Sequence, residues 1–345
     1  MFVDTVSNEV TPEMKQLLKD SVSTNPAVAG PATFALKAAL SMPLKQGILF
    51  GDTVSGIFQQ VPFNPGEPVE FPLDAIPAAQ VKLHIAYTMP HEGYVPQRTI
   101  EADYVTVKTF RVATSVDWSR EVAKFCRWDI VGRAMQVADA GLIRKRNNDG
   151  FHTLLAAAVD RGLSIYDSTA ASGLFTKRLI ALAQTVMRRN AGGNSTSINR
   201  GKLTHVCLSP EMLHDIRSWD VTQIDEFTRK QIFDAGDDMY SLTKIFGVTL
   251  VDIDEFGAGQ EYENYYEGTL AATVPGSKSE IMLGLDLTNG LQDSFVMPWI
   301  KQDNGQFWEM HDDPTLLRYN KAGFYKWGRY GVSILDSRRV LILAA

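Results

Sequence analysis

The clearest pattern in the chain is a run of apolar positions, spaced three and four residues apart, over residues 118–159. This spacing places the apolar side chains on one face of a helix. The stripe comprises Phe125, Trp128, Val131, Met135, Ala138 and Leu142 and, beyond a polar stretch, Phe151, Leu154, Leu155 and Ala158. A continuous helix, capped by Asp117, would span ~60 Å at 1.5 Å per residue and act as a structural spar. A kink or break at Asn147-Asn148-Asp149-Gly150 is the competing prediction.

The first 50 residues predict short helices on a tether. Thr11-Pro12-Glu13 combines a capping hydroxyl, a proline suited to the first helical position and a carboxylate. A second helix is expected over residues 32–40. Each piece is marginal alone, so this region is either an arm that gains order on a neighbouring surface or an ordinary helical edge of a domain.

The pattern changes over residues 51–104, which hold seven of the 15 prolines. Proline removes a backbone donor and breaks helices, so extended structure is expected here. Strand-like stretches cover residues 52–61, including Val54 and Ile57, and residues 81–87, with a turn at Asn64-Pro65-Gly66 between them. Such an arm has few residues with which to build a core, and it requires a neighbour to pack on.

Strands resume over residues 102–115, and the region after the long helix alternates helices and strands. Helices are expected over residues 174–189, from Ser209-Pro210-Glu211 to about Trp219, and over residues 222–234. Strands are expected over residues 204–208, 246–253, 279–285, 324–334 and 340–343, and a surface loop over residues 190–201. The order αβααββ between residues 174 and 285 describes a small α/β domain.

Composition narrows the class of protein. The 345 residues carry 34 Lys and Arg against 40 Asp and Glu, a net charge of -6, so nucleic-acid wrapping through a basic surface is not indicated. Only two cysteines occur, Cys126 and Cys207, which excludes a disulfide-rich secreted scaffold. No apolar run approaches the ~20 residues of a membrane span, and the amino end lacks a signal-peptide pattern. We therefore expect a soluble protein of a reducing compartment with one to three domains.

Motifs that carry chemistry are incomplete. His91-Glu92 begins a zinc-protease motif, but Val95 stands where the second histidine belongs. Gly276-Ser277-Lys278-Ser279 lacks the glycine before lysine and the following helix of a phosphate loop. No G-x-S-x-G elbow and no C-x-x-C pair occurs. The sequence therefore predicts no catalytic, cofactor-binding or metal-binding residues, no cofactor and no enzyme activity.

Four weaker features have simpler structural interpretations. Asp252, Asp254 and Glu255 can hold a hard cation, although a solvated strand end or an ion pair between subunits is the favoured interpretation. His311-Asp312-Asp313 is expected to be a turn, and His205 a hydrogen-bonded residue of a buried strand. Arg144-Lys145-Arg146 can contact phosphates of bound nucleic acid, but a solvated helix face or pairing with nearby acidic residues is favoured.

The order of these parts resembles the HK97-like major capsid proteins of tailed double-stranded DNA bacteriophages. The most suggestive stretches are residues 201–219, 222–236, 240–257 and 319–336. The resemblance implies an α+β fold with an N-terminal arm (1–50), an extended E-loop region (51–100), a peripheral domain (101–173 and 286–345) with a spine helix at about 118–159, and an axial domain (174–285). It also implies self-assembly, through hexamers and pentamers clamped by arm and loop, into the icosahedral shell that encloses the phage DNA.

The resemblance also implies partners and a location. The partners are other copies of the chain, a separate scaffolding protein, a portal, a decoration protein and packaged double-stranded DNA contacted without sequence specificity, with no membrane partner. The location is the virion, after assembly in the host bacterial cytoplasm. A scaffolding extension is not expected, because the chain reaches its arm within a few residues of Met1.

Some family members crosslink their subunits through an E-loop lysine. Here the only lysine of that loop, Lys82, lies in a strand-like run, so covalent crosslinking is not expected. Two alternatives remain. An encapsulin-type compartment shell shares the same fold but houses cargo enzymes. An α/β enzyme with a cleft near residues 190–201 belongs to a different class, and the missing acid/base and phosphate motifs argue against it.

Overall fold

A computed structural model defines the architecture of the chain. It describes residues 52–74, 102–119, 128–190, 201–219, 244–288, 294–302 and 305–345. Several expected features lie outside these residues: the helices before residue 50, the strand at 81–87, Lys82, the His91-Glu92 motif, most of the loop at 190–201, and the helix at 222–234.

A single long helix, α6 (Trp128–Arg161), runs through the molecule for 34 residues, or about 51 Å at 1.5 Å per residue. It passes without a break through Asn147-Asn148-Asp149-Gly150, so the continuous helix is confirmed over this part. The predicted apolar face is buried at Met135, Ala138, Leu142, Phe151, Leu154, Leu155 and Ala158.

The predicted start of this helix was wrong. Residues 118 and 119 belong to strand β4 (Phe110–Ser119), and Asp117 does not cap a helix. It pairs instead with Lys321 Nζ at 2.6 Å across the sheet. The physical reason is the full-length pairing of β4 with a distant strand, β12 (Lys321–Tyr330), which extends β4 beyond the residues that the local pattern predicts as a strand.

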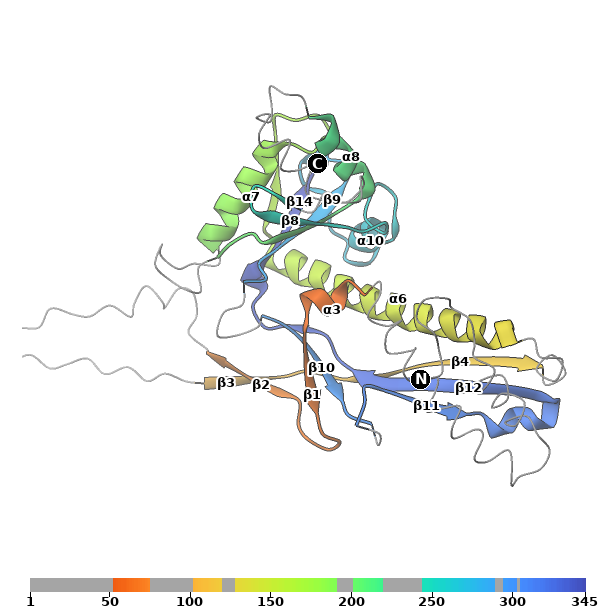
Figure 1. Cartoon of the computed structure of the whole chain (residues 1–345). Coiled ribbons are helices and arrows are strands. Elements are labelled where there is room, and N and C mark those ends of the chain that lie inside the picture. Colours follow the sequence, from red (N-terminus) through yellow and green to blue (C-terminus); the bar gives the residue numbers. More distant parts are fainter. Residues whose placement is uncertain are drawn as a thin grey trace, which may run out of the picture.

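The first sheet forms an elongated platform under α6 (Figure 1). Strand β12 lies between β4 and β11 (Trp308–Asp312), antiparallel to both, and η3 (Pro314–Tyr319) joins β11 to β12. Three further strands complete the sheet: β1 (Gln59–Phe63), β10 (Phe295–Ile300) and β13 (Ser333–Ile334). β1 runs parallel to β10 at the edge of the sheet, and β13 pairs antiparallel with β10. Met135 and Ala138 of α6 pack on Phe324 of β12 in a small core.

A short helix, α3 (Val54–Ile57), replaces part of the strand that was expected over residues 52–61. Val54 and Ile57 are buried in the main core because α3 packs against α6. Gly150 of α6 permits this contact, since a Cβ atom at that position would lie 2.6 Å from Val54 Cγ2. The glycine that suggested a weak point in the helix is therefore a packing site.

The second sheet forms a separate lobe in the order β5-β14-β9-β6-β8-β7 (Figure 1). Its strands are β5 (Ser164–Tyr166), β6 (His205–Leu208), β7 (Lys244–Ile245), β8 (Val248–Asp252), β9 (Ile281–Leu285) and β14 (Val340–Ala344). All five positions of β9 and of β14 are buried, as expected for strands covered on both faces. β5 and β14 come from outside residues 174–285 and complete this sheet.

Helices cover both faces of the lobe. α7 (Lys177–Asn190) and α8 (Pro210–Ser218) pack on one face. α10 (Glu261–Asn264), the π-helical turn Tyr265–Thr269 and the second half of α6 pack on the other. Two short 3-10 turns, Pro275–Ser277 and Ser337–Arg339, precede β9 and β14.

Most local predictions for the lobe are confirmed. Ser209 caps α8 by accepting a hydrogen bond from the Met212 amide at 3.3 Å. The strand expected over residues 246–253 begins later, because Phe246 has a positive φ of 50° in the tight turn between β7 and β8. The strands predicted over residues 204–208, 279–285 and 340–343 are present, with small differences at their ends. Outside the lobe, the strand predicted over residues 102–115 is divided between β3 and β4, and the strand predicted over residues 324–334 between β12 and β13.

Candidate assembly surface

A two-stranded ribbon projects from the platform. β2 (Glu70–Asp74) and β3 (Ala102–Thr106) pair antiparallel, from Glu70 opposite Thr106 to Asp74 opposite Ala102. Neither strand pairs with another strand among the described residues, so both outer edges of the ribbon are unpaired there. Figure 1 shows the ribbon on the opposite side of β1 from β11 and the far end of β12. The Asp74–Ala102 pair also fixes where residues 75–101 leave and rejoin the fold.

The ribbon buries little of itself. Tyr104 is 62% exposed, whereas Val69 and Val107 at the base are buried. An isolated two-stranded ribbon is marginally stable in water, and unpaired edges readily accept another strand. The ribbon therefore has the properties of an element that gains stability from further pairing or packing.

Other large apolar side chains are exposed elsewhere on the molecule. Among the described residues they are Phe110, Val137, Tyr166, Leu174, Phe246 and Tyr319. They are distributed over the platform, α6 and the lobe, and scattered single exposures are normal on a protein surface. They extend the range of candidate contact points but do not form one patch.

The basic run on α6 is engaged within the chain. Arg144 Nη2 lies 3.0 Å from Glu261 Oε2, and Lys145 Nζ lies 2.6 Å from Asp149 Oδ1. Arg146 forms a buried ion pair with Asp52, and burial lowers the pKa of Arg146 to about 10. The prediction that these residues pair with acidic neighbours is confirmed. Sequence reasoning missed Asp52 because this partner lies 94 positions away along the chain.

Polar residues on the same stretch of α6 connect it to its neighbours. Tyr330 OH of β12 donates to Asp149 Oδ2 at 2.9 Å. Asn148 Nδ2 donates to Glu261 Oε1 at 2.7 Å, and Tyr262 OH donates to Asn148 Oδ1 at 3.2 Å. The residues that predicted a kink therefore hold the platform and α10 to the long helix.

One turn further along, His152 stacks on Tyr265, with ring centroids 3.8 Å apart and ring planes within 13° of parallel. Burial lowers the pKa of His152, because the charged imidazolium loses hydration there. The contact joins α6 to the π-helical turn that follows α10.

A buried ion pair joins the platform to the first half of α6. Lys326 Nζ of β12 lies 2.8 Å from Asp139 Oδ1, and the two residues are 3% and 7% exposed. Burial lowers the pKa of Lys326 and raises that of Asp139. No motif in the sequence indicated this pair. The available signal was a carboxylate next to Ala138 on the apolar face of a helix.

The remaining predicted residues have structural roles. The predicted turn at His311-Asp312-Asp313 was wrong for its first two residues, which belong to β11 because they pair with β12. Asp313 Oδ1 begins the turn by accepting from the Thr315 amide at 2.9 Å. His205 Nδ1 lies 3.0 Å from Thr204 Oγ1 in β6, which confirms its hydrogen bonding.

Among the described residues, neither the incomplete phosphate loop nor the acidic residues near Asp252 form a ligand-binding arrangement. Lys278 of the incomplete phosphate loop donates from Nζ to the carbonyl oxygen of Ala170 at 2.7 Å. Within the described ranges, no cluster of three or more histidine, cysteine or acidic residues is arranged to hold a metal ion, the residues near Asp252 included. No helix in the described part of the chain has the length and apolarity of a bilayer span.

Comparisons with known proteins show which solved structures this architecture resembles. No protein-family model matches the chain, and no curated protein matches it in sequence. Solved structures do match. The acid-stable capsid structure of Helicobacter pylori bacteriophage KHP30 aligns with a TM-score of 0.55 at 10% identity, covering 86% of this chain and 92% of that one. A chain of Microbacterium phage Oxtober96 aligns with a TM-score of 0.54 at 10% identity, covering 85% and 91%.

The mature capsid of bacteriophage PhiM1 gives a TM-score of 0.52 at 13% identity, covering 86% of this chain and 87% of that one. The chain has a phage-capsid fold. This confirms the α+β, HK97-like fold class that was expected from the order of the parts. The likeness extends over about 85% of the chain and includes both the platform and the lobe.

Proposed function

We propose that this chain is the major capsid protein of a tailed double-stranded DNA bacteriophage. Its copies assemble through hexamers and pentamers into the icosahedral shell around the genome. The observation that carries the proposal is the fold, which is shared with phage capsid chains over most of both partners' lengths. The role is structural rather than catalytic.

In this proposal each part of the fold has an assembly role. The platform with α6 is the peripheral domain and its spine. The lobe is the axial domain of residues 174–285, with β5 and β14 added to its sheet. The ribbon of β2 and β3 is the base of the E-loop, and residues 1–50 form the N-terminal arm.

The physical argument for assembly is the ribbon itself. Among the described residues both edges of the ribbon are unpaired, and such edges gain stability when another strand or surface covers them. In a shell, contact with a neighbouring subunit offsets the conformational entropy that is lost when the ribbon becomes ordered.

Further partners follow from the same proposal. We propose a separate scaffolding protein, a portal, a decoration protein and packaged DNA contacted without sequence specificity. The location is the virion, after assembly in the host cytoplasm. Arg144 and Lys145 are already engaged by acidic side chains, so contact with DNA would have to compete with those pairs.

Expression of the chain followed by negative-stain microscopy tests the proposal. Uniform shells or hexameric rings are the expected result. Shells that co-purify with an enclosed enzyme would favour the encapsulin alternative. A persistent monomer or dimer at all concentrations would refute the proposal and favour the α/β enzyme.

Replacement of the loop between β2 and β3 tests the assigned role of the ribbon. Because Asp74 and Ala102 are paired antiparallel, residues 75–101 can be replaced by Asn-Gly, a two-residue hairpin turn. The expected result is a folded subunit with native circular dichroism that forms no stable shells. Loss of folding would show that the loop belongs to the subunit's own core, and normal shells would show that assembly does not need it.

A further inference from the structure

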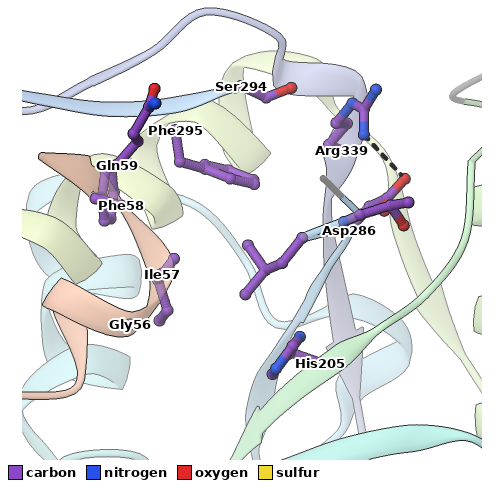
Figure 2. A pocket seen from close by; sticks show the side chains of 11 residues that line it. Gly56, Ile57, Phe58, Gln59, His205, Asp286, Ser294, Phe295 and Arg339 are labelled. Atoms are coloured by element: carbon purple, nitrogen blue, oxygen red, sulfur yellow. Dashed lines mark hydrogen bonds and ion pairs between the residues drawn. The ribbon is translucent and has the colours of Figure 1, made fainter. Parts of the chain in front are cut away.

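A pocket of about 470 Å³ lies between the platform and the lobe. One wall comes from α3 and the start of β1, the other from β6 and the segment after β9 (Figure 2). Residues that line it include Gly56, Ile57, Phe58, Gln59, Asp286, Phe295 and Arg339.

The two walls differ in chemistry. Ile57, Phe58 and Phe295 lie behind one wall, where they are 9%, 2% and 4% exposed and the two phenylalanine rings are in edge contact at 5.9 Å, so this wall offers little free apolar surface. The opposite wall carries Arg339, whose guanidinium faces Asp286 (Figure 2). The occupant that fits therefore carries a hydrogen-bonding group toward Arg339.

Arg339 retains unused donor capacity. Its Nη1 lies 3.5 Å from Asp286 Oδ2 and its Nε lies 3.9 Å from Asp336 Oδ2, both longer than a hydrogen bond. The buried Nε has no hydrogen-bond partner among the described residues. Asp286 is meanwhile held by the Lys202 and Thr288 amides, each at 3.0 Å.

The charges of the side chains at this wall determine whether an anionic or a neutral acceptor fits Arg339. Asp336 is held by Arg338 through Nε at 2.8 Å and Nη2 at 2.9 Å, and Asp286 opposes Arg339. The charges at this wall therefore balance, and no net positive charge is left to attract an anion. A neutral acceptor requires no surplus positive charge and still satisfies the guanidinium. A peptide carbonyl is such an acceptor.

An unpaired strand edge begins at the mouth of the same pocket. Gln59 is both a lining residue and the first residue of β1. β1 pairs only with β10 within the described part of the chain, so its other edge offers backbone groups to an added strand. Phe63 at the end of β1 contacts Phe71 of β2, with centroids 5.8 Å apart. The free edge of β1 is therefore continuous with the ribbon.

We propose that this pocket and the free edge of β1 receive an extended segment of a second copy of the chain. The segment adds to β1 as a strand and presents a backbone carbonyl to Arg339. The second copy is the occupant because the edge continues into the ribbon, and the proposal therefore rests on the assembly function given above.

Thiol labelling tests whether assembly covers the pocket. Gln59→Cys is made in a Cys126→Ser background and reacted with a maleimide. Cys207 is buried, and burial raises its pKa to about 12, so it stays unreactive. The chain is expressed alone, so that any cover comes from the chain itself. The expected result is labelling at least tenfold slower in shells than in unassembled subunits, and full labelling after denaturation.

Equal labelling rates in shells and subunits would overturn the proposal. Slow labelling in both states would also overturn it, because the subunit's own residues would then cover the site. If the unmodified chain forms no shells at all, the proposed function has failed instead, and the two failures are thereby distinguished.

A size series at Gly56 provides a second test. A Cβ atom at this exposed position meets nothing within 4 Å, so Gly56→Ala and Gly56→Phe are both expected to fold with unchanged subunit melting temperatures. Gly56→Ala should assemble like the parent, whereas Gly56→Phe obstructs the pocket and should reduce shell yield at least tenfold. Normal shells from Gly56→Phe would contradict the proposal.

Discussion

Replacement of Lys326 by methionine removes one partner of the buried pair between β12 and α6. Asp139, only 7% exposed, then remains in the interior without its counter-ion. The least costly response of the folded protein is to protonate Asp139. At pH 7 this costs about 1.36 × (7 − 3.9), or about 4 kcal/mol, which agrees with the ~3–5 kcal/mol seen when buried pairs lose one partner.

The destabilisation caused by each of the two single substitutions is expected to change with pH, and in opposite directions. At pH 5 the cost of protonating Asp139 falls to about 1.5 kcal/mol, so the destabilisation by Lys326→Met shrinks as the pH falls. Asp139→Leu behaves in the opposite way, because the remaining Lys326 must lose a proton. Its cost is about 4.6 kcal/mol at pH 7 and rises to about 7 kcal/mol at pH 5.

The assay is urea unfolding of the unassembled subunit at pH 7 and pH 5, for the parent, both single variants and the double variant Lys326→Met/Asp139→Leu. The double variant should recover most of the lost stability, because no buried charge remains. Losses below about 1 kcal/mol for both single variants, or losses independent of pH, would refute the reasoning that the pair is buried and ionised.

Two further predictions concern α6. Gly150→Ala should destabilise the subunit by about 1–2 kcal/mol despite the better helix propensity of alanine, because its Cβ would lie 2.6 Å from Val54 Cγ2. Urea unfolding in a Val54→Ala background should show the loss relieved, and an equal loss there would contradict this packing. Burial lowers the pKa of His152, so its stabilisation is present above pH ~6.5 and is lost as the pH falls below that value. His152→Phe, which keeps a ring against Tyr265, should therefore flatten the decline in unfolding free energy between pH 7 and pH 5, and an unchanged slope would contradict this.

The features that the sequence predicted well are local ones. The apolar stripe from Met135 to Ala158 specifies a helix through spacing alone, and Ser209-Pro210-Glu211 specifies the start of α8 in the same way. The fold class followed from the order of such elements, and the solved capsid structures confirm it.

The features that the sequence did not show depend on distant partners. Gly150 and its polar neighbours carry a high local cost in a helix, and only the packing of Val54 and the bonds to Tyr330 and Glu261 make them favourable. β4 extends to Ser119 because β12 pairs with it along its whole length. None of these contacts leaves a local periodicity, since each joins residues about 90 or more positions apart.

In the proposed function, this chain builds a shell through the ribbon of β2 and β3. A cryo-EM reconstruction of the particles formed by the expressed chain tests it most directly. We expect closed icosahedral shells in which the ribbon of each subunit lies on a neighbouring subunit. A chain that stays monomeric or dimeric at every concentration, or shells in which the ribbon touches no neighbour, would contradict it.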